Sequence, residues 1–155
     1  MQTLSVRFAN EQDGRLIYEW RNDAHSRRMS HRMDEIDWPE HQIWFKKSLC
    51  SKARILLMCE NDLAIPVALV RFDLSHVTAT ISISLNPIMR GKKLAKPCLV
   101  ACLDFFTIRH PSVTKLIAEI KEVNVASSKV FLGVGFHKVK VEGGVGLYQK
   151  QIPKR

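Results

Sequence analysis

Three strand-like segments follow one another in the middle of this sequence, at residues 54–60, 66–73 and 77–85. The links between them are short and polar, which leaves room only for tight reversals and predicts an antiparallel meander. Asn86–Pro87 then breaks the chain, and the largely apolar residues 91–110 predict a long helix. We therefore expect a fold that combines a sheet with helices.

The segments on either side extend this pattern over the whole chain. Apolar residues at helical spacing predict a helix that starts at Glu11 behind an N-cap at Asn10. Pro39 fits the first turn of a second helix, whose apolar side would carry Ile43, Trp44 and Leu49. The other expected elements are strands at 4–8, 115–121, 136–141 and 145–152, a hairpin turn at Gly143–Gly144, a short helix at 125–132, and short helical pieces with loop at 24–37. No repeat or linker interrupts them, so we expect one domain over residues 1–155.

Size and composition fit a globular protein that works in water. Of the 155 residues, 46% are hydrophobic and 25% are charged, as is ordinary for a folded domain. The first residues lack a basic stretch followed by an apolar one, and apolar runs such as residues 64–70 fall far short of the roughly 20 residues of a membrane span. We expect a cytoplasmic protein that does not contact a membrane.

The cysteines and the net charge give weaker constraints on the cofactors and partners of this protein. Four cysteines, Cys50, Cys59, Cys98 and Cys102, form no Cys-x-x-Cys pair, so we expect buried reduced thiols and no metal. The net charge of +9 favours a polyanionic partner, which includes nucleic acid as well as a coenzyme or nucleotide with several phosphates. The basic residues are scattered along the chain, so the charge does not choose between these partners.

The most informative local motif is a strand that leads through a basic turn into a helix. The strand-like residues 81–87 are followed by Arg90-Gly91-Lys92-Lys93-Leu94-Ala95 and then by the long apolar segment. The first N–H groups of a helix have no partner within the helix, and its N-terminal end carries partial positive charge. Such a turn predicts a site for phosphate or another anion.

This motif, together with Asn124, Ser127, Phe131 and Gly135–Phe136, resembles the signature of the GNAT acetyltransferases. The resemblance implies an α/β (α+β) GNAT fold: a mixed, mostly antiparallel, twisted sheet of about seven strands flanked by about four helices. It also implies acetyl-CoA as co-substrate, with its pyrophosphate on a turn of the pattern (Gln/Arg)-x-x-Gly-x-(Gly/Ala). Lys93 stands where that pattern has its middle glycine. The implied coenzyme-binding residues are Ile83, Ser84, Leu85, Arg90, Gly91, Lys92, Lys93, Leu94, Ala95, Lys96, Asn124, Ser127 and Phe131.

The N-terminal half is similar to a GNAT subgroup that acetylates sugar nucleotides, closest to the UDP-4-amino-sugar N-acetyltransferases of pseudaminic acid biosynthesis. The similarity rests on Trp20-Arg21-Asn22-Asp23 and on Glu40-His41 followed by Trp44-Phe45. It implies substrate contacts from Arg21, His41 and Arg71. Read alone, Arg21 could instead pair with a surface carboxylate, and His41 could be a core or surface residue.

One carboxyl group and two hydroxyl groups are candidates for proton transfer. Glu119 interrupts an apolar strand, where a carboxylate must be paired or face a cleft, so it is a candidate base or else a salt-bridge partner of Lys115 or Lys121. Many GNAT members have a tyrosine acid where this chain has Phe131. Ser127, Ser128 or a water could replace it, or the thiolate could leave unaided.

The resemblance implies direct attack of a neutral amine on the thioester in a ternary complex, with the backbone N–H near Leu85 polarising the carbonyl. We expect a small-molecule acceptor, a nucleotide-linked amino sugar, rather than nucleic acid, and a homodimer stays open. Two alternatives also stay open: an acetyltransferase of protein N-termini, of the ribosomal-protein type, and a non-catalytic module that binds acyl-CoA or nucleic acid.

Overall fold

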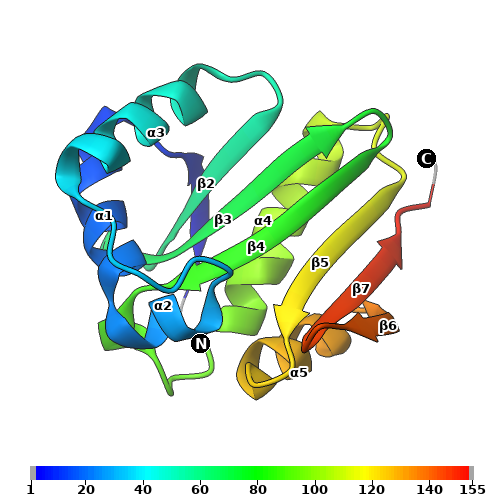
Figure 1. The fold of residues 1–155 in the computed structure, drawn as a ribbon. Helices are drawn as coiled ribbons and strands as arrows, with labels where there is room; N and C mark the ends of the chain where they lie inside the picture. The colour runs from blue at the N-terminus through cyan, green and yellow to red at the C-terminus, as the bar shows by residue number, and fades with distance from the viewer. Residues whose placement is uncertain (1–2, 154–155) are drawn as a thin grey trace.

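A seven-stranded sheet runs through the molecule with helices on both of its faces (Figure 1). The computed structural model describes residues 3–153. The strands, in the spatial order β1-β2-β3-β4-β5-β7-β6, are β1 (Ser5–Phe8), β2 (Arg54–Glu60), β3 (Pro66–Ser75), β4 (Thr78–Leu85), β5 (Lys115–Lys121), β7 (Val145–Gln151) and β6 (His137–Glu142). Neighbouring strands are antiparallel except β4 and β5, which are parallel.

Five α-helices and two short 3-10 turns connect these strands in the part of the chain that the structure describes. They are η1 (Glu11–Asp13), α1 (Gly14–Asn22), α2 (Ala24–Met29), α3 (Trp38–Cys50), η2 (Pro87–Met89), α4 (Ala95–Arg109) and α5 (Val125–Gly133). The parallel pair β4–β5 follows from the connection through α4, because parallel neighbours need a crossover whereas the short links of β2–β3–β4 allow only tight reversals. The expected fold class is confirmed.

Each face of the sheet has its own hydrophobic core. On one face α4 and α5 cover the middle strands, and the rings of Phe72 and Phe106 stack with centroids 3.9 Å apart. On the other face α1 and α3 cover β2 and β3, where Ile17, Trp20 and Phe45 meet Leu56 and Met58. The β4 side chains that point to this second face are exposed at Thr80 and Ser82 and half-buried at Thr78 and Ser84, so no helix fully covers the sheet there.

The structure corrects two details of the expected elements. Helix α4 starts at Ala95 rather than at residue 91, because residues 91–94 form a turn in which Gly91 and Lys93 have positive φ. In α3 the buried side carries His41, Phe45 and Ser48, so the assignment of Ile43, which is exposed, to the apolar side was wrong. Residues 41, 45 and 48 recur at helical spacing, which turns residue 43 to solvent.

Three of the four cysteines match the expected buried free thiols, whereas Cys50 is exposed. Among residues 3–153, no group of three or more His, Cys, Asp and Glu side chains is arranged to hold a metal ion. Across the same residues, no helix has the length and apolarity that crossing a membrane requires.

Candidate active site

The parallel strands β4 and β5 diverge after three residue pairs. Their ladder joins Thr78 to Lys115, Ala79 to Leu116 and Thr80 to Ile117, and within the described residues it continues no further. Residues 81–85 of β4 remain paired to β3 on their other side, which keeps this edge rigid. Figure 1 shows the two strands separating toward their C-terminal ends. Because the N–H of Asn86 bonds to Val67 next to β3, alternation along the strand turns the backbone N–H and C=O groups of Leu85 and Ile83 toward the splay between β4 and β5, where they can bind an extended polar ligand.

The turn that follows β4 presents a concentration of positive charge. Asn86 anchors it, since its side chain accepts from the N–H of Ile88 at 3.2 Å and donates to the carbonyl of Pro66 at 2.9 Å. Gly91 and Lys93 take positive φ values of 74° and 59°. Helix α4 then begins at Ala95, and its N-cap residue, Leu94, makes no side-chain cap hydrogen bond, so the first N–H groups of the helix are free to bind a ligand. Lys92, Lys93 and Lys96 are exposed around them, which makes this end of α4 suited to phosphate.

Lys93 adopts the backbone conformation that a glycine would take at no steric cost. Replacing Lys93 with glycine is therefore expected to raise the free energy of unfolding by about 0.5–1 kcal/mol, the left-handed penalty being partly offset by the greater unfolded-state entropy of glycine. Lys92 lacks a positive φ and serves as the matched control, for which the same replacement should lower stability by about 0.5–1 kcal/mol. Urea denaturation of both variants measures the difference, and equal effects would contradict the argument.

The side chain of Arg90 does not point to the free end of α4. It forms an ion pair with Asp23, the N-cap residue of α2, and donates to the hydroxyl of Ser26 at 2.9 Å. The resemblance implied that Arg90 holds the pyrophosphate, yet the structure engages its guanidinium with α2. The groups at this turn that are open to an anion are therefore the backbone N–H groups and the lysines.

The Asp23–Arg90 pair makes stability depend on pH in the acid range. The hydrogen bond from Arg90 lowers the pKa of Asp23 from 3.8 to about 2. Because the unfolded chain takes up the proton first, the stabilisation is fully present above about pH 5 and is lost as the pH falls toward 2. Asp23→Asn cannot titrate, so between pH 5 and pH 2.5 it should lose less stability than the wild type in urea denaturation. Parallel losses in the two proteins would show that this pair does not contribute.

The first turn of α5 borders the splay from the β5 side. Asn124 caps the helix by accepting from the N–H of Ser127 at 3.2 Å. One turn on, the hydroxyl of Ser128 accepts a hydrogen bond from Tyr148 at 3.1 Å. Phe131 is buried and packs edge-to-face against Phe136, so it is a core residue. Tyr148 was missed by the sequence reading, because only the pairing of β7 with β5 brings it under α5.

Across the sheet from α5, three arginines gather around one indole ring. The guanidinium carbons of Arg21, Arg71 and Arg54 lie 4.0, 5.6 and 5.7 Å from the ring centroid of Trp44. Asp73 binds two of them, Arg54 at 2.7 Å and Arg71 at 2.9 Å. Within residues 3–153, no ion pair includes Arg21.

The charge of Arg21 is not compensated by an ion pair with any carboxylate among the described residues. Burial, followed by the nearby charge of Arg71, lowers the pKa of Arg21 to about 10, so it is still protonated at neutral pH. Around the indole, three positive charges thus share the one carboxylate of Asp73. Glu40 also acts on Arg21, but it is ion-paired with Arg32, so positive charge remains in excess. A cavity of about 510 Å³, lined by Trp44, Lys47, Ser48, Ser51, Ala53, Arg54, Asp73 and Leu74, adjoins the cluster and adds a further ammonium group. Guanidinium groups bind phosphate and carboxylate well, so this region suits an anionic ligand.

His41, expected to contact the substrate, is completely buried. Its Nε2 lies 2.8 Å from the carbonyl oxygen of Gly14, and its Nδ1 lies 3.0 Å from Nη1 of Arg21. With both ring nitrogens engaged and no exposed surface, His41 does not reach a ligand directly. The prediction that His41 contacts the substrate directly was therefore wrong. The imidazole lies beneath Arg21 and contacts its guanidinium.

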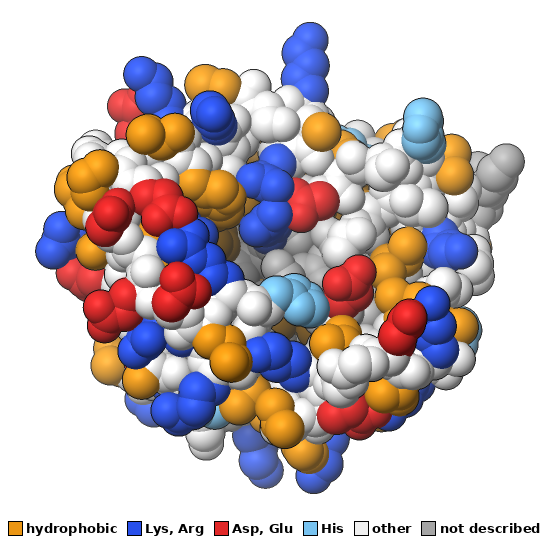
Figure 2. Space-filling view, in the orientation of Figure 1, with side chains coloured by type: hydrophobic (Ala, Val, Ile, Leu, Met, Phe, Trp, Pro, Cys, Tyr) orange, Lys and Arg blue, Asp and Glu red, His pale blue; other side chains and the backbone are white. Residues whose placement is uncertain are grey.

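Glu119 faces the open side of the sheet, because Leu116, Ala118 and Ile120 alternate with it toward α4 and α5. It is exposed, and Oε2 lies 3.5 Å from Nε2 of His31, in the segment after α2. The expected lysine partners of Glu119 are thus replaced by His31, which the sequence analysis missed. Figure 2 shows this face hollowed near its centre, with Lys or Arg side chains on both sides and a histidine and acidic side chains at the edge.

The sequence matches the family model described as acetyltransferase (GNAT) domain over residues 3–137. The chain belongs to the GNAT acetyltransferase family. None of the curated protein sequences matches it at a significant level. Many solved structures share the fold of this GNAT domain. Their sequence identities are low, so they support the fold and not a shared substrate.

Three of these structures cover nearly the whole chain. A domain from Methanocaldococcus jannaschii aligns over 98% of this chain and 100% of its own with a TM-score of 0.84 and 20% identity. Spermidine N-acetyltransferase from Vibrio cholerae, in complex with CoA and spermine, aligns over 96% and 95% with a TM-score of 0.84 and 18% identity. An aminoglycoside acetyltransferase in complex with coenzyme A aligns over 96% and 95% with a TM-score of 0.79 and 15% identity.

Two groups of the expected site residues come together in this GNAT domain. The end of β4, the lysine-bearing turn and the start of α5 frame the splay, whereas Arg21 and Arg71 share the indole of Trp44 on the open face. Arg90, His41 and Phe131 have structural partners of their own. His31, Arg54 and Tyr148 are additions that only the tertiary structure identifies.

Proposed function

We propose that this GNAT domain transfers the acetyl group of acetyl-CoA to the amine of a nucleotide-linked amino sugar. The observation that carries the acceptor assignment is the half-buried Arg21, which stacks on Trp44 beside two more arginines and has no carboxylate partner among the described ion pairs. A diphosphate would supply the missing negative charge. A polyamine would instead bring further positive charge into the pocket, which Coulomb repulsion disfavours.

The residues around the splay fit coenzyme A. In our proposal the free N–H groups at the start of α4, with Lys92, Lys93 and Lys96, bind its pyrophosphate. The pantetheine arm lies along Ile83, Ser84 and Leu85 and is bordered by Asn124 and Ser127. Acetyl-CoA supplies the thioester carbonyl, and the backbone N–H of Leu85 donates toward the carbonyl oxygen as negative charge develops there.

Proton transfer falls to the groups on the two sides of the splay. The amine nitrogen forms a bond to the carbonyl carbon, the carbon–sulfur bond breaks, and Glu119 accepts the proton that the amine releases. Because His31 contacts the same carboxylate, it can pass the proton on to solvent. Ser128, which accepts a hydrogen bond from Tyr148, donates its proton to the departing thiolate while it takes up the proton of Tyr148, and Tyr148 then regains a proton from solvent.

The test is a comparison of acceptors at saturating acetyl-CoA, with release of free CoA as the measurement. A UDP-linked 4-amino sugar, spermidine, an aminoglycoside and a peptide with a free N-terminus should be assayed side by side. We expect the UDP-linked sugar to give a kcat/KM at least 100-fold above that of spermidine. Faster turnover of the peptide would overturn the amino-sugar assignment in favour of N-terminal acetylation, and no CoA release with any amine would overturn the catalytic assignment.

A further inference from the structure

Behind Arg21 lies a histidine that the acetylation chemistry does not use. The imidazole of His41 is completely buried, and four aromatic rings, those of Tyr18, Trp38, Trp44 and Phe45, surround it at centroid distances of 5.2 to 5.8 Å. Its two polar contacts are the carbonyl of Gly14 and the guanidinium of Arg21. A buried polar ring in apolar surroundings is costly unless both nitrogens are satisfied, and here both are.

The two partners define the protonation state of this ring. A carbonyl oxygen only accepts, so Nε2 must carry the hydrogen that reaches Gly14 at 2.8 Å. A guanidinium only donates, so Nδ1 must offer its lone pair to Arg21 at 3.0 Å. Burial first, and then the charge of Arg21, lower the pKa of His41 more than its bond to Gly14 raises it. The imidazole is neutral.

The close approach of α1 to α3 allows His41 to contact both Gly14 and Arg21. A Cβ atom at residue 14 would lie 3.2 Å from Cδ2 of Phe45, so the absence of a side chain at Gly14 lets the two helices meet. The carbonyl of Gly14 then reaches His41 on α3, while Arg21 reaches the same ring from the last turn of α1. One imidazole thus bridges the two ends of α1.

We propose that His41 is a positioning residue that sets the charge preference of the acceptor pocket. Its lone pair holds the guanidinium of Arg21 in place without neutralising it, so the full positive charge is kept for the acceptor. A carboxylate at this position would hold Arg21 as firmly but cancel its charge. This inference rests on the proposed function, because it assumes that the acceptor brings an anionic group to Arg21.

The experiment is a calorimetric titration of the CoA-saturated protein with UDP, so that the α4 turn is already occupied. His41→Gln keeps one acceptor and one donor, and we expect UDP affinity within about threefold of wild type. His41→Phe keeps an aromatic ring in the stack but neither hydrogen bond, and should bind UDP at least 10-fold more weakly. His41→Glu should bind it about 100-fold more weakly. In all three variants the affinity for CoA should be unchanged.

Tyr18→Phe is the matched control, since it keeps a ring against His41 and should bind UDP like the wild type. If His41→Phe binds UDP as tightly as the wild type, the positioning role is overturned. If the buried carboxylate of His41→Glu prevents folding, the glutamine and phenylalanine variants decide by themselves. Nitrogen NMR of the wild type adds a readout independent of UDP: a neutral ring protonated at Nε2 at pH 6 is expected, and any other form overturns the inference. A wild type that shows this ring but does not bind UDP contradicts the proposed acceptor, not the role of His41 toward Arg21.

Discussion

Replacing Arg21 with methionine is expected to lower kcat/KM for an anionic amine acceptor by about 100-fold, while the affinity for CoA stays unchanged. Arg21 is the guanidinium that lies 4.0 Å from the Trp44 ring centroid without a carboxylate partner among the described ion pairs. Hydrogen bonds to a charged partner contribute about 1.5–3 kcal/mol each, which corresponds to this loss. Methionine keeps much of the apolar stem, so the change removes mainly the charge and its donors.

Arg15→Met is the matched control for this prediction. Arg15 lies on the same helix and also approaches aromatic rings, Tyr18 at 5.3 Å and Trp38 at 5.1 Å, but its side chain is exposed and pairs with Glu19. Steady-state kinetics over a range of acceptor concentrations should show an effect at Arg21 and none at Arg15. Equal losses in the two variants would mean that positive charge anywhere on α1 steers the acceptor, and that no specific contact forms.

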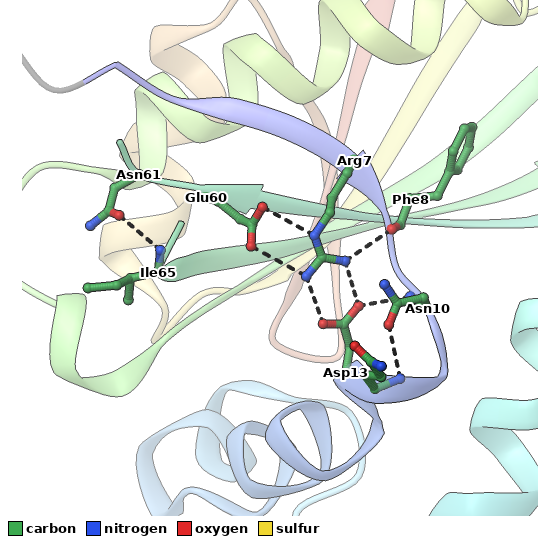
Figure 3. Close-up of polar contacts among 8 residues, drawn as sticks. Arg7, Phe8, Asn10, Asp13, Glu60, Asn61 and Ile65 are labelled. Atoms are coloured by element: carbon green, nitrogen blue, oxygen red, sulfur yellow. Dashed lines mark hydrogen bonds and ion pairs between the residues drawn. The ribbon is translucent and has the colours of Figure 1, made fainter. Parts of the chain in front are cut away.

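Replacing Asp13 with asparagine should lower the free energy of unfolding by about 3 kcal/mol. Asp13 is buried and binds Arg7 through two bonds of 2.8 Å each, and it also accepts from the N–H of Asn10 at 2.8 Å (Figure 3). Although burial raises the pKa of Asp13, the bonds from Arg7 and Asn10 lower it by more. Asparagine would leave Arg7 without this partner, and breaking a buried pair from one side costs about 3–5 kcal/mol; Arg7 is a third exposed, which favours the lower end.

Glu60→Gln provides the comparison, because Glu60 contacts the same guanidinium at 3.2 and 3.4 Å. Its removal leaves both bonds between Arg7 and Asp13 in place, so we expect a loss of only about 1 kcal/mol. Urea denaturation at pH 7 measures both variants. A smaller loss at Asp13 than at Glu60 would contradict the role of Asp13 as the buried anchor between β1 and the start of α1.

Elements that depend on local patterns could be predicted from the sequence. The ranges 54–60 and 115–121 are the bounds of β2 and β5, and Pro39 lies in the first turn of α3, where a proline is tolerated. Alternation, helical spacing and backbone breakers act over a few residues, so they can be read without knowing what lies opposite. The basic turn before α4 is also a feature that the local sequence predicts, because the first N–H groups of any helix lack a partner within that helix.

The candidate site could be predicted only in part. Arg21 and Arg71 were expected to act together, and Trp44 does join them, although they are 50 residues apart and lie on different elements. The sequence could not show that Arg54 shares the same ring, nor that His31 meets Glu119. Such contacts depend on which strands pair and on where the segment after α2 returns, and no local pattern carries that information.

By itself, the sequence determined the order of the strands and helices along the chain, the positive charge of the turn before α4, and the family. The tertiary structure alone decided which charges are left without a partner. Arg90 is engaged by Asp23, 67 residues away, while Arg21 meets a neutral histidine instead of a carboxylate. The physical reason is that a residue type sets the charge of a side chain, whereas its compensation depends on neighbours that only the folded chain brings near.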